Sequence, residues 1–481
     1  TAPLLVEKMR KRYGIPETWS DEDARAVIGF RYEFDLRGIT NLPTYTFLED
    51  VTDQQLSAIL ELNTPGLQVE ASTVREYHTQ FGAHILGYLG GMDDAEWAKY
   101  KDEGYSMDAY VGQSGFEEAF EKYLHGIDGT RYDEVNRQGT TTKSYYLPGK
   151  EPVAGNNVET TIDIDIQEVA EEALEDAVLW ARDIERNTAA QTKEKEGADV
   201  QGAAVVVMET KTGNILACAS YPTYNLATMH EDWKEIEENP YNPFFNRAFG
   251  AEYPPGSTFK MCTLIAAMEN KNSKGEIIHP YKTEIKDEGV YTKYQGFTPT
   301  CLAWTSGRYT HGVIDASLAL CYSCNYFFYE LGDRLANSTG GKKALDDTAK
   351  GLGLGEPTGI ELVEDIGHRA NEETKKMLYA GTIDAHFYTG NVILAAIGQD
   401  ENKFSPLQLC VYASTLANQG TRMRATFLNR VVSADYRSLV YKNEPKVMSK
   451  MKISDETYNA YVEGMINVVS GGRGTARETM K

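Results

Sequence analysis

The sequence contains no run of about 18 apolar residues, so we expect no part of it to span a bilayer as a helix. Positive charge is scarce: 48 Lys and Arg residues stand against 71 Asp and Glu, which leaves a formal net charge of −23. Because nucleic-acid binding needs a basic surface, this balance excludes nucleic acid as a main partner. Hydrophobic residues make up 41% and charged residues 25%, which is typical of a globular protein rather than a disordered one.

Cysteine is scarce as well, with six residues in a chain of 481. So few cysteines do not make a disulfide-rich scaffold. All six fall between Cys218 and Cys410, which predicts that they belong to one domain.

The start of the chain lacks two further features. Thr1 stands where an initiator Met would, and no short apolar segment of a signal peptide follows it. We therefore expect a processed or excised piece of a protein, with a membrane-anchoring helix upstream of it.

The length favours two or three domains of about 150 residues each. A polar stretch at residues 145–153 contains Pro148, Gly149 and Pro152 and predicts a domain boundary. We expect a first domain at residues 1–152 and a second at residues 153–481. Within the first, the alternation over residues 83–90 predicts a strand.

The second domain begins with patterns of both helix and strand. Apolar residues from Ile166 to Ala173 recur at helical spacing. The run at residues 202–208 predicts a buried strand, with residues 215–220 as its hairpin partner after a turn at 211–214. A strand pair followed by helices predicts an α+β domain, in which helices flank an antiparallel sheet.

The clearest chemical pattern is Ser-x-x-Lys at Ser257 and Lys260, after a Pro-Pro-Gly turn and before an apolar helix at residues 261–269. Residues three apart on a helix share a face, so the Lys260 amine comes within reach of the Ser257 hydroxyl. A buried lysine has a lowered pKa and can accept the serine's proton near neutral pH. The simpler interpretation makes Ser257 an N-cap and Lys260 a solvated residue. Ser449 and Lys452 repeat the pattern in a charged stretch.

A second pattern, Ser323-Cys324-Asn325, lies between two apolar helical stretches and is the one Ser-x-Asn in the chain. A serine there can relay a proton between a lysine and a leaving amine, and the asparagine amide can hold a substrate carbonyl and the lysine. The alternative is a helix–helix loop that uses Ser and Asn for its turn.

Together these patterns resemble the transpeptidase domain of class B penicillin-binding proteins, of the elongation or sporulation type, within the Ser-x-x-Lys acyl transferases. In the first domain, residues 82–90 and 112–117 resemble the family's non-catalytic pedestal, a dimerisation-type domain. The stretches that carry the resemblance in the second domain are residues 160–163 with Gln167, 215–225, 246–248, 254–260, 311–312, 323–329, 397–399 and 405–409.

The resemblance implies a peptidoglycan D,D-transpeptidase of the penicillin-binding fold. In that family the residue at Ser257 attacks the penultimate D-Ala carbonyl of a stem peptide, and the acyl-enzyme passes to a neighbouring stem's amine. Lys260 would be the base, Ser323 the proton relay and Asn325 a substrate-binding residue. β-Lactam antibiotics mimic D-Ala-D-Ala and would acylate Ser257. The chemistry requires no cofactor.

The family's third motif, Lys-Thr/Ser-Gly, has a literal match only at Lys211-Thr212-Gly213, which precedes Ser257. We expect this match to be a hairpin turn unrelated to the motif. Residues 473–476 resemble the Gly-Thr-Ala segment that precedes the true motif's strand, and the sequence ends at Lys481. We therefore expect the third motif and the C-terminal strands to be missing. The family's N-terminal Arg-Gly-x-Ile-x-Asp-Arg segment is missing as well, so we expect both ends to be trimmed.

This interpretation predicts that the 481-residue chain, expressed as it stands, binds a fluorescent penicillin poorly or not at all. The reason is that the strand carrying the third motif would complete the substrate site. Gel fluorescence after labelling measures the adduct, and full stoichiometric labelling would contradict the prediction.

Cys301, His311 and Cys324 form a candidate metal site, because thiolate and imidazole suit Zn²⁺ in a closed tetrahedral site. The fourth ligand would be Asp287, which precedes Glu288-Gly289, or Cys321, one helical turn before Cys324. Some elongation-type relatives have an acid, a His before Gly, and the Cys of the Ser-Cys-Asn motif in these places. The alternatives are a disulfide between Cys301 and Cys324, or free buried thiols.

The resemblance also implies a place and partners. The protein would act on the extracytoplasmic face of the bacterial cell membrane, anchored by an N-terminal transmembrane helix outside this chain, beside a membrane-embedded glycan polymerase. The alternatives are a β-lactam-sensing receptor or a non-catalytic scaffold of the same superfamily. A D,D-carboxypeptidase is chemically close, since only the acceptor differs. A β-lactamase is disfavoured, because the sequence shows no Glu-based deacylation motif and a β-lactamase would not need the pedestal.

Overall fold

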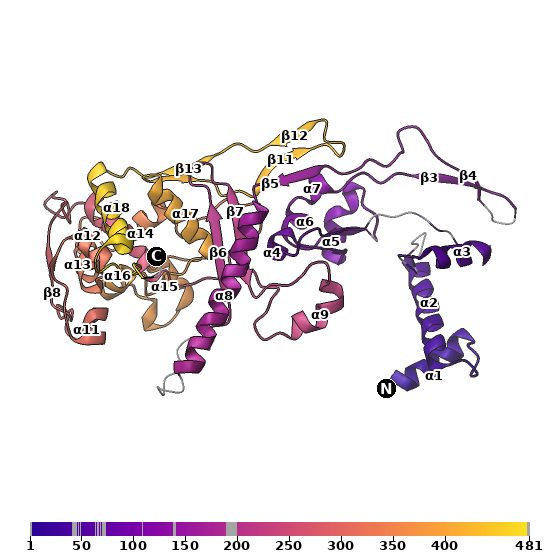
Figure 1. Cartoon of the computed structure of the whole chain (residues 1–481), viewed down its shortest axis with the longest axis horizontal. Helices are drawn as coiled ribbons and strands as arrows, with labels where there is room; N and C mark the ends of the chain where they lie inside the picture. The colour runs from indigo at the N-terminus through magenta and orange to yellow at the C-terminus, as the bar shows by residue number, and fades with distance from the viewer. Residues whose placement is uncertain are drawn as a thin grey trace. The chain divides into compact units, whose positions relative to one another are not determined.

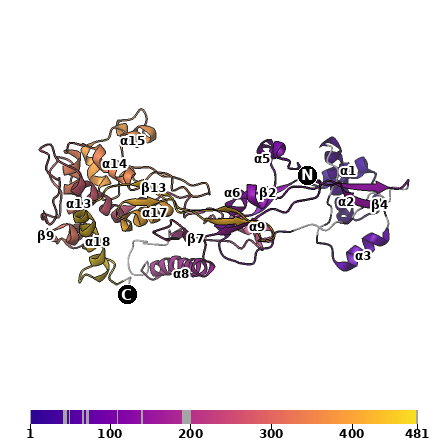
Figure 2. The same cartoon turned by 90° about the horizontal axis from the view of Figure 1, so that it is seen from above.

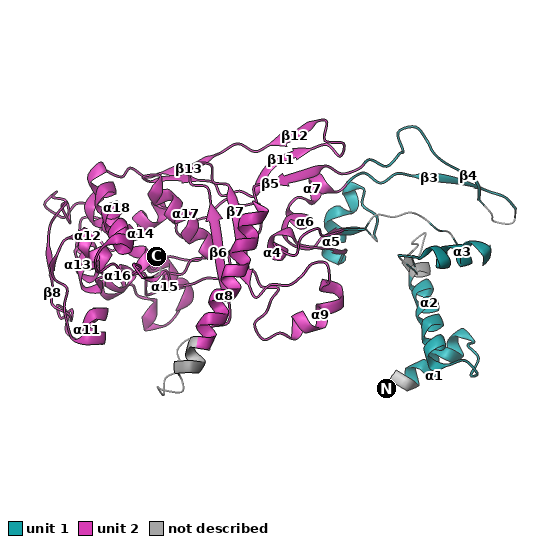
Figure 3. Ribbon diagram, in the orientation of Figure 1, with its two compact units in different colours: residues 1–75, 91–110, 126–153 teal, residues 76–90, 111–125, 154–481 magenta. Residues whose placement is uncertain are grey.

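A computed structural model gives the fold of the chain (Figure 1). It describes residues 2–478 apart from residues 41–45, 47, 49, 63, 65–66, 68, 70–73, 108, 138–140 and 189–199. Contacts divide the chain into two compact units (Figure 3). Unit 1 comprises residues 1–75, 91–110 and 126–153, and unit 2 comprises residues 76–90, 111–125 and 154–481. The domain ranges 1–152 and 153–481 stay a prediction.

Unit 1 combines helices with a hairpin. Its helices are α1 (Ala2–Tyr13), α2 (Asp21–Thr40), α3 (Asp53–Leu62), α5 (Asp94–Tyr100) and the 3₁₀ turn η1 (Lys101–Glu103), and β3 (Arg131–Val135) pairs with β4 (Thr141–Tyr146). The Arg10 guanidinium donates to the carbonyls of Pro16, Trp19 and Ser20 and so holds the turn between α1 and α2. The chain passes between the units within β1 (Leu89–Gly91) and β2 (Tyr110–Gly112), which pair with each other.

Unit 2 is built on an antiparallel pair, β6 (Ala203–Met208) and β7 (Ile215–Tyr221), with α8 (Ile164–Thr188) alongside (Figures 1 and 2). Side chains alternate between the faces of a strand. Val205 and Val207 accordingly pack toward Ala170 and Leu174 of α8. Val206, on the other face, packs into a second apolar cluster. The predicted hairpin at residues 202–220 is confirmed.

A second sheet joins early and late parts of the chain. It has the order β12 (Leu439–Lys442), β11 (Leu428–Val432), β5 (Asn157–Thr160). Three short helices follow one another here: α7 (Glu121–Leu124) packs against β5, α6 (Gly115–Ala119) packs against α7, and α4 (Ala83–Leu86) packs against α6 and β7. Phe116 of α6 meets the ring of Phe427 with centroids 5.2 Å apart. This buried aromatic contact places residues 111–125 in unit 2.

The predicted strand at residues 83–90 is wrong. Residues 83–86 form α4, and only Leu89–Gly91 is extended as β1. Gly82 and Gly87, with φ of 77° and 76°, bracket the helix in positive-φ conformations that glycine adopts readily. A Cβ on Gly87 would lie 1.9 Å from the Ser114 carbonyl oxygen, so close backbone packing explains this glycine.

The rest of unit 2 is a helical body around one apolar core. The core helices are α10 (Lys260–Glu269), α12 (Ala316–Cys321), α13 (Asn325–Ala336), α14 (Lys343–Gly351), α16 (Thr389–Ala395), α17 (Pro406–Ala417) and α18 (Asp455–Ser470). Helix α10 is at its centre, because residues 262–268 are all buried. A helix that is apolar all round must be covered on every side, so its register is fixed by packing.

Shorter elements complete the unit. They are α9 (Met229–Glu238), η2 (Gly256–Phe259), the pair β8 (Ile285–Asp287) and β9 (Gly312–Ile314), α11 (Leu302–Gly307), α15 (Glu372–Leu378), η3 (Ile383–Ala385), and the pair β10 (Thr421–Met423) and β13 (Val447–Lys450). Antiparallel sheets flanked by helices confirm the predicted α+β class. Among the described residues, no helix has the length and apolar content that crossing a membrane requires.

Candidate active site and metal cluster

Ser257 lies in a tight turn at the entrance to α10. Gly256 has φ of 55° and begins η2, which runs directly into the helix at Lys260. The Thr258 hydroxyl donates to the Pro255 carbonyl at 2.7 Å and closes the turn. Ser257 is exposed, whereas Lys260, three residues on, is only 1% exposed. The turn therefore presents a hydroxyl to solvent and a lysine to the interior.

Lys260 is buried among acceptors from one neighbouring segment. Its Nζ donates to the Ser323 carbonyl at 2.8 Å, the Ser323 hydroxyl at 2.9 Å and Asn325 Oδ1 at 2.7 Å. These contacts satisfy the three donors of an ammonium group. Burial lowers the pKa of Lys260 to about 8, because the interior disfavours the charged form.

The Ser323 hydroxyl lies between the other two groups. Its Oγ is 2.8 Å from Ser257 Oγ and 2.9 Å from Lys260 Nζ, so a continuous chain of hydrogen bonds joins Ser257 to the lysine. Ser323 has φ of 50°, in the left-handed region that non-glycine residues seldom adopt. The structure thus brings together all four residues singled out from sequence: Ser257, Lys260, Ser323 and Asn325.

The Lys211-Thr212-Gly213 sequence is a hairpin turn between β6 and β7, as expected. Lys211 donates to Asn418 Oδ1 at 2.8 Å, at the end of α17. Gly213 has φ of 88°, and a Cβ there would lie 2.0 Å from the Arg424 carbonyl oxygen. Packing and turn geometry explain this sequence without reference to the Ser257 site.

One contact at the helix start was not apparent from sequence. The buried Tyr412 hydroxyl of α17 accepts a hydrogen bond from the Cys262 backbone N–H at 3.0 Å. It donates one to the Thr258 carbonyl at 3.2 Å. It thereby satisfies a backbone donor and an acceptor in the first turn of α10. Tyr412 is 150 residues from Cys262 in the sequence, so no local sequence pattern indicates that the two form a hydrogen bond.

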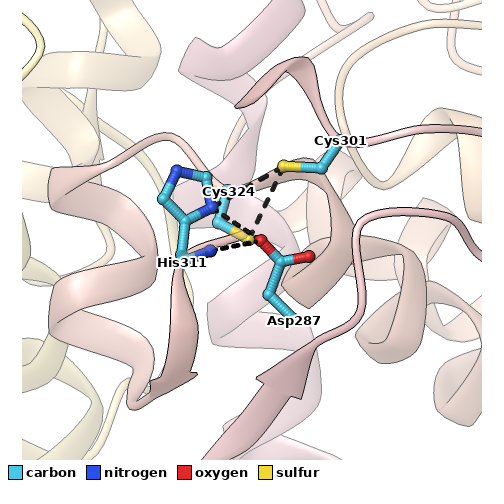
Figure 4. Close-up of side chains that lie close together, drawn as sticks. All are labelled: Asp287, Cys301, His311 and Cys324. Atoms are coloured by element: carbon cyan, nitrogen blue, oxygen red, sulfur yellow. Dashed lines mark hydrogen bonds and ion pairs between the residues drawn. The ribbon is translucent and has the colours of Figure 1, made fainter. Parts of the chain in front are cut away.

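Asp287, Cys301, His311 and Cys324 converge within unit 2 (Figure 4). One ligand atom from each lies within 4.8 Å of the other three. Asp287 ends β8, Cys301 caps α11, His311 precedes β9, and Cys324 stands between the active-site candidates Ser323 and Asn325. Cys321, the alternative fourth ligand, instead donates from its thiol to the Asn467 carbonyl of α18 at 3.3 Å.

The spacing of this cluster suits a tetrahedral zinc ion. Two sulfurs each about 2.3 Å from a tetrahedral zinc would be about 3.8 Å apart, and the Cys301 and Cys324 sulfurs are 3.9 Å apart. His311 Nδ1 is 3.7 Å from Cys301 Sγ and 2.8 Å from Asp287 Oδ2. Both cysteines are free thiols here, since a disulfide would bring the sulfurs to about 2.05 Å.

Hydrogen bonds within the cluster shift the pKa values of two of its members. The Asp287 carboxylate and the Cys301 sulfur raise the pKa of His311 to about 9, by hydrogen bonding to the protonated ring. The Cys324 and His311 hydrogen bonds lower the pKa of Cys301 to about 4, against the effect of burial. A bound dication would need both groups in their deprotonated forms, so binding would release the His311 proton.

Comparison with known proteins decides the family. The family model for the penicillin binding protein transpeptidase domain matches residues 203–481, more than half of the chain. The chain belongs to this family. The model for the penicillin-binding protein dimerisation domain matches residues 6–160. These two matches confirm the resemblance to class B penicillin-binding proteins.

Curated relatives include two peptidoglycan D,D-transpeptidases named MrdA. The one from Acinetobacter baumannii is 27% identical over 422 residues, which cover 86% of this chain and 56% of that protein. The one from Escherichia coli K12 is 26% identical over 454 residues, which cover 91% of this chain and 64% of that protein. The chain thus spans less than two thirds of the length of these relatives.

Solved structures share the fold. A structure titled for the coordination of polymerization and crosslinking by a peptidoglycan synthase complex is 27% identical, with a TM-score of 0.69 over 94% of this chain and 73% of that one. The complex of PBP2 and MreC from Helicobacter pylori has a TM-score of 0.71 at 20% identity, and it covers all of this chain and 80% of the other. The second likeness shows the fold alone.

The lowered pKa of Lys260 predicts how the free energy of unfolding changes with pH. Between pH 8 and pH 10.5 the folded lysine is neutral while the unfolded lysine is still protonated, so the unfolded state binds more protons and stability rises with pH. The free energy of unfolding of the wild type, relative to that of Lys260→Met, should rise by up to about 3 kcal/mol over this window. Denaturant titrations of both proteins measure it, and a constant difference would contradict the shift.

Proposed function

We propose that this chain carries the catalytic part of a peptidoglycan D,D-transpeptidase, with Ser257 as nucleophile. The observation that carries the proposal is the hydrogen-bonded chain from Ser257 through Ser323 to the buried Lys260. Membership of the transpeptidase family and the MrdA relatives support the substrate class, a stem peptide ending in D-Ala-D-Ala.

The geometry suggests how the proton moves. With a pKa of about 8, roughly one Lys260 side chain in ten is neutral at pH 7. A neutral amine keeps two N–H groups, which donate to the Ser323 carbonyl and to Asn325 Oδ1, and its lone pair then faces the Ser323 hydroxyl. Ser257 passes its proton to Ser323 as Ser323 passes its own to Lys260, which frees the Ser257 oxygen to attack.

The rest of the cycle conserves atoms and charge. The Ser257 oxygen bonds to the penultimate D-Ala carbonyl carbon, the C–N bond breaks, and the leaving D-Ala amine takes a proton from Lys260 through Ser323. The amine of a neighbouring stem then attacks the ester carbonyl carbon and the ester C–O bond breaks. The amine gives up one proton, which passes through Lys260 and Ser323 to the Ser257 oxygen. Asn325 holds both the lysine and the substrate carbonyl. A β-lactam enters the same first step and stays on Ser257 as an ester.

A dimerisation-domain match over residues 6–160 favours this function over a β-lactam-sensing receptor, which has no need of a pedestal. The four hydrogen-bonded polar residues favour it over a non-catalytic scaffold. By analogy with the peptidoglycan synthase complex, we propose wall-synthesis proteins as partners, among them a membrane-embedded glycan polymerase. The site of action would be the extracytoplasmic face of the membrane.

We also propose a structural zinc ion held by Asp287, Cys301, His311 and Cys324. Zinc would supply no step of the chemistry. It would fix Cys324, and with it the backbone of the adjacent Ser323 and Asn325, to the β8–β9 pair. The ion would therefore stabilise the acceptors that hold Lys260.

The nucleophile assignment predicts the outcome of a mass measurement on the full-length gene product treated with benzylpenicillin. The wild type should gain the mass of one β-lactam, and Ser257→Ala should gain none because the attacking hydroxyl is gone. Ser449→Ala is the matched control, since Ser449 begins the other Ser-x-x-Lys sequence, and it should be labelled like the wild type. An adduct that survives Ser257→Ala would refute the assignment.

The zinc proposal predicts about one zinc per chain in protein purified without chelators, measured by elemental analysis. Cys301→Ser should lower the zinc content at least tenfold, because it replaces a thiolate ligand. Cys410→Ser is the control, since Cys410 bonds to the Val206 carbonyl in another part of unit 2. Wild-type protein without zinc would end the proposal.

A further inference from the structure

The turn that carries Ser257 is bonded along its length to a second segment, residues 398–404. The Gly256 N–H donates to the Gly398 carbonyl at 3.0 Å. Tyr253 and Phe404 exchange two backbone hydrogen bonds, of 3.0 and 2.9 Å. The rings of Phe259 and Phe404 stack with centroids 6.3 Å apart and planes 7° from parallel. The position of Ser257 therefore depends on where residues 398–404 lie.

The backbones of Gly398 and Gly256 are closely packed. Gly398 has φ of 74°, and a Cβ on it would lie 2.1 Å from the Gly256 carbonyl oxygen. The two backbones are in direct contact, so a displacement of Gly398 moves Gly256 and the adjacent nucleophile with it.

Segment 398–404 is in turn held by a buried ionic cluster that the proposed reaction does not use. Lys375, on α15, pairs with Asp400 at 3.4 Å and with Glu401 at 2.8 Å. The Tyr379 hydroxyl donates to Glu401 at 2.9 Å, and the Asn391 amide of α16 donates to Asp400 at 2.8 Å. The three charged side chains are 7–14% exposed, so solvent screens these pairs little.

The backbone at Asp400 indicates what the cluster does. Asp400 has φ of 60°, a left-handed conformation that residues other than glycine, asparagine and aspartate rarely adopt. It lies two residues after Gly398, between the two points at which segment 398–404 bonds to the Ser257 turn. The side-chain bonds from Lys375 and Asn391 hold the residue in this conformation and so define the path of the chain at Gly398.

We propose that the Lys375–Asp400–Glu401 cluster positions the Gly398 carbonyl, and through it the Ser257 turn, for acylation, with Asp400 as the main positioning residue. The acylation part of this inference rests on the function proposed above. The mechanical part, that the cluster holds the turn, does not.

The experiment uses Asp400→Asn, which keeps the shape and removes the charge, and Asp400→Gly, which also removes any cost of the left-handed backbone. Amide hydrogen exchange measures the protection of residues 253–259, and benzylpenicillin kinetics on the full-length gene product separate the acylation rate from the initial binding constant. We expect faster exchange at Tyr253 and Gly256 in both variants, and acylation about tenfold slower with unchanged initial binding.

Two further variants separate positioning from general stability. Asp333→Asn removes another buried carboxylate, which pairs with Lys293 and lies on α13, outside segment 398–404. It should leave exchange of residues 253–259 and the acylation rate unchanged. Lys375→Arg keeps the charge and should retain most of the wild-type acylation rate.

Each result decides a separate question. Unchanged exchange of residues 253–259 in the Asp400 variants would overturn the proposal, and so would equal effects of Asp333→Asn. Faster exchange with an unchanged acylation rate would also overturn the proposal, because acylation would then not depend on holding the Ser257 turn in place. Wild-type protein that is never acylated would instead refute the proposed function, while the exchange measurement would still decide whether the cluster holds the turn.

Discussion

The burial of the Lys260 amine is the constraint on which the site depends. An amine that is 1% exposed must find acceptors inside the protein, because an unpaired charge there would be very costly. All three of its acceptors come from Ser323 and Asn325. That requirement draws the loop between α12 and α13 over the start of α10, and it sets the Ser323 hydroxyl beside Ser257.

Two other parts of the fold contact the loop that carries Ser323 and the turn that carries Ser257. Cys324 of the loop contacts Cys301, and both lie in the cluster that contains Asp287 of β8 and His311 before β9. A backbone hydrogen bond from Gly256 to Gly398 attaches the nucleophile's turn to the chain after α16. The turn that carries Ser257 and the loop that holds the Lys260 amine thus have separate supports, which share no residue.

Much of this was predictable from sequence, for identifiable reasons. The spacing of Ser257 and Lys260 requires only one helical turn, and the hairpin at residues 202–220 follows from alternation and a turn. The strand predicted at residues 83–90 was wrong because Gly82 and Gly87 adopt positive-φ backbone conformations, which permit a short helix between them. The ionic cluster of Lys375, Asp400 and Glu401 could not be predicted from the sequence, because Lys375 lies on a separate element and no spacing rule connects it to the other two.

The sequence by itself determined which chemical groups are present and which neighbours in the chain can act together. It therefore specified the α+β class, the family resemblance and the candidate residues. Only the tertiary structure decided that Ser323 lies between Ser257 and Lys260, and that Asp287 rather than Cys321 completes the cluster with Cys301. Those contacts join residues tens of positions apart, and packing of the helical core, not local spacing, sets their distances.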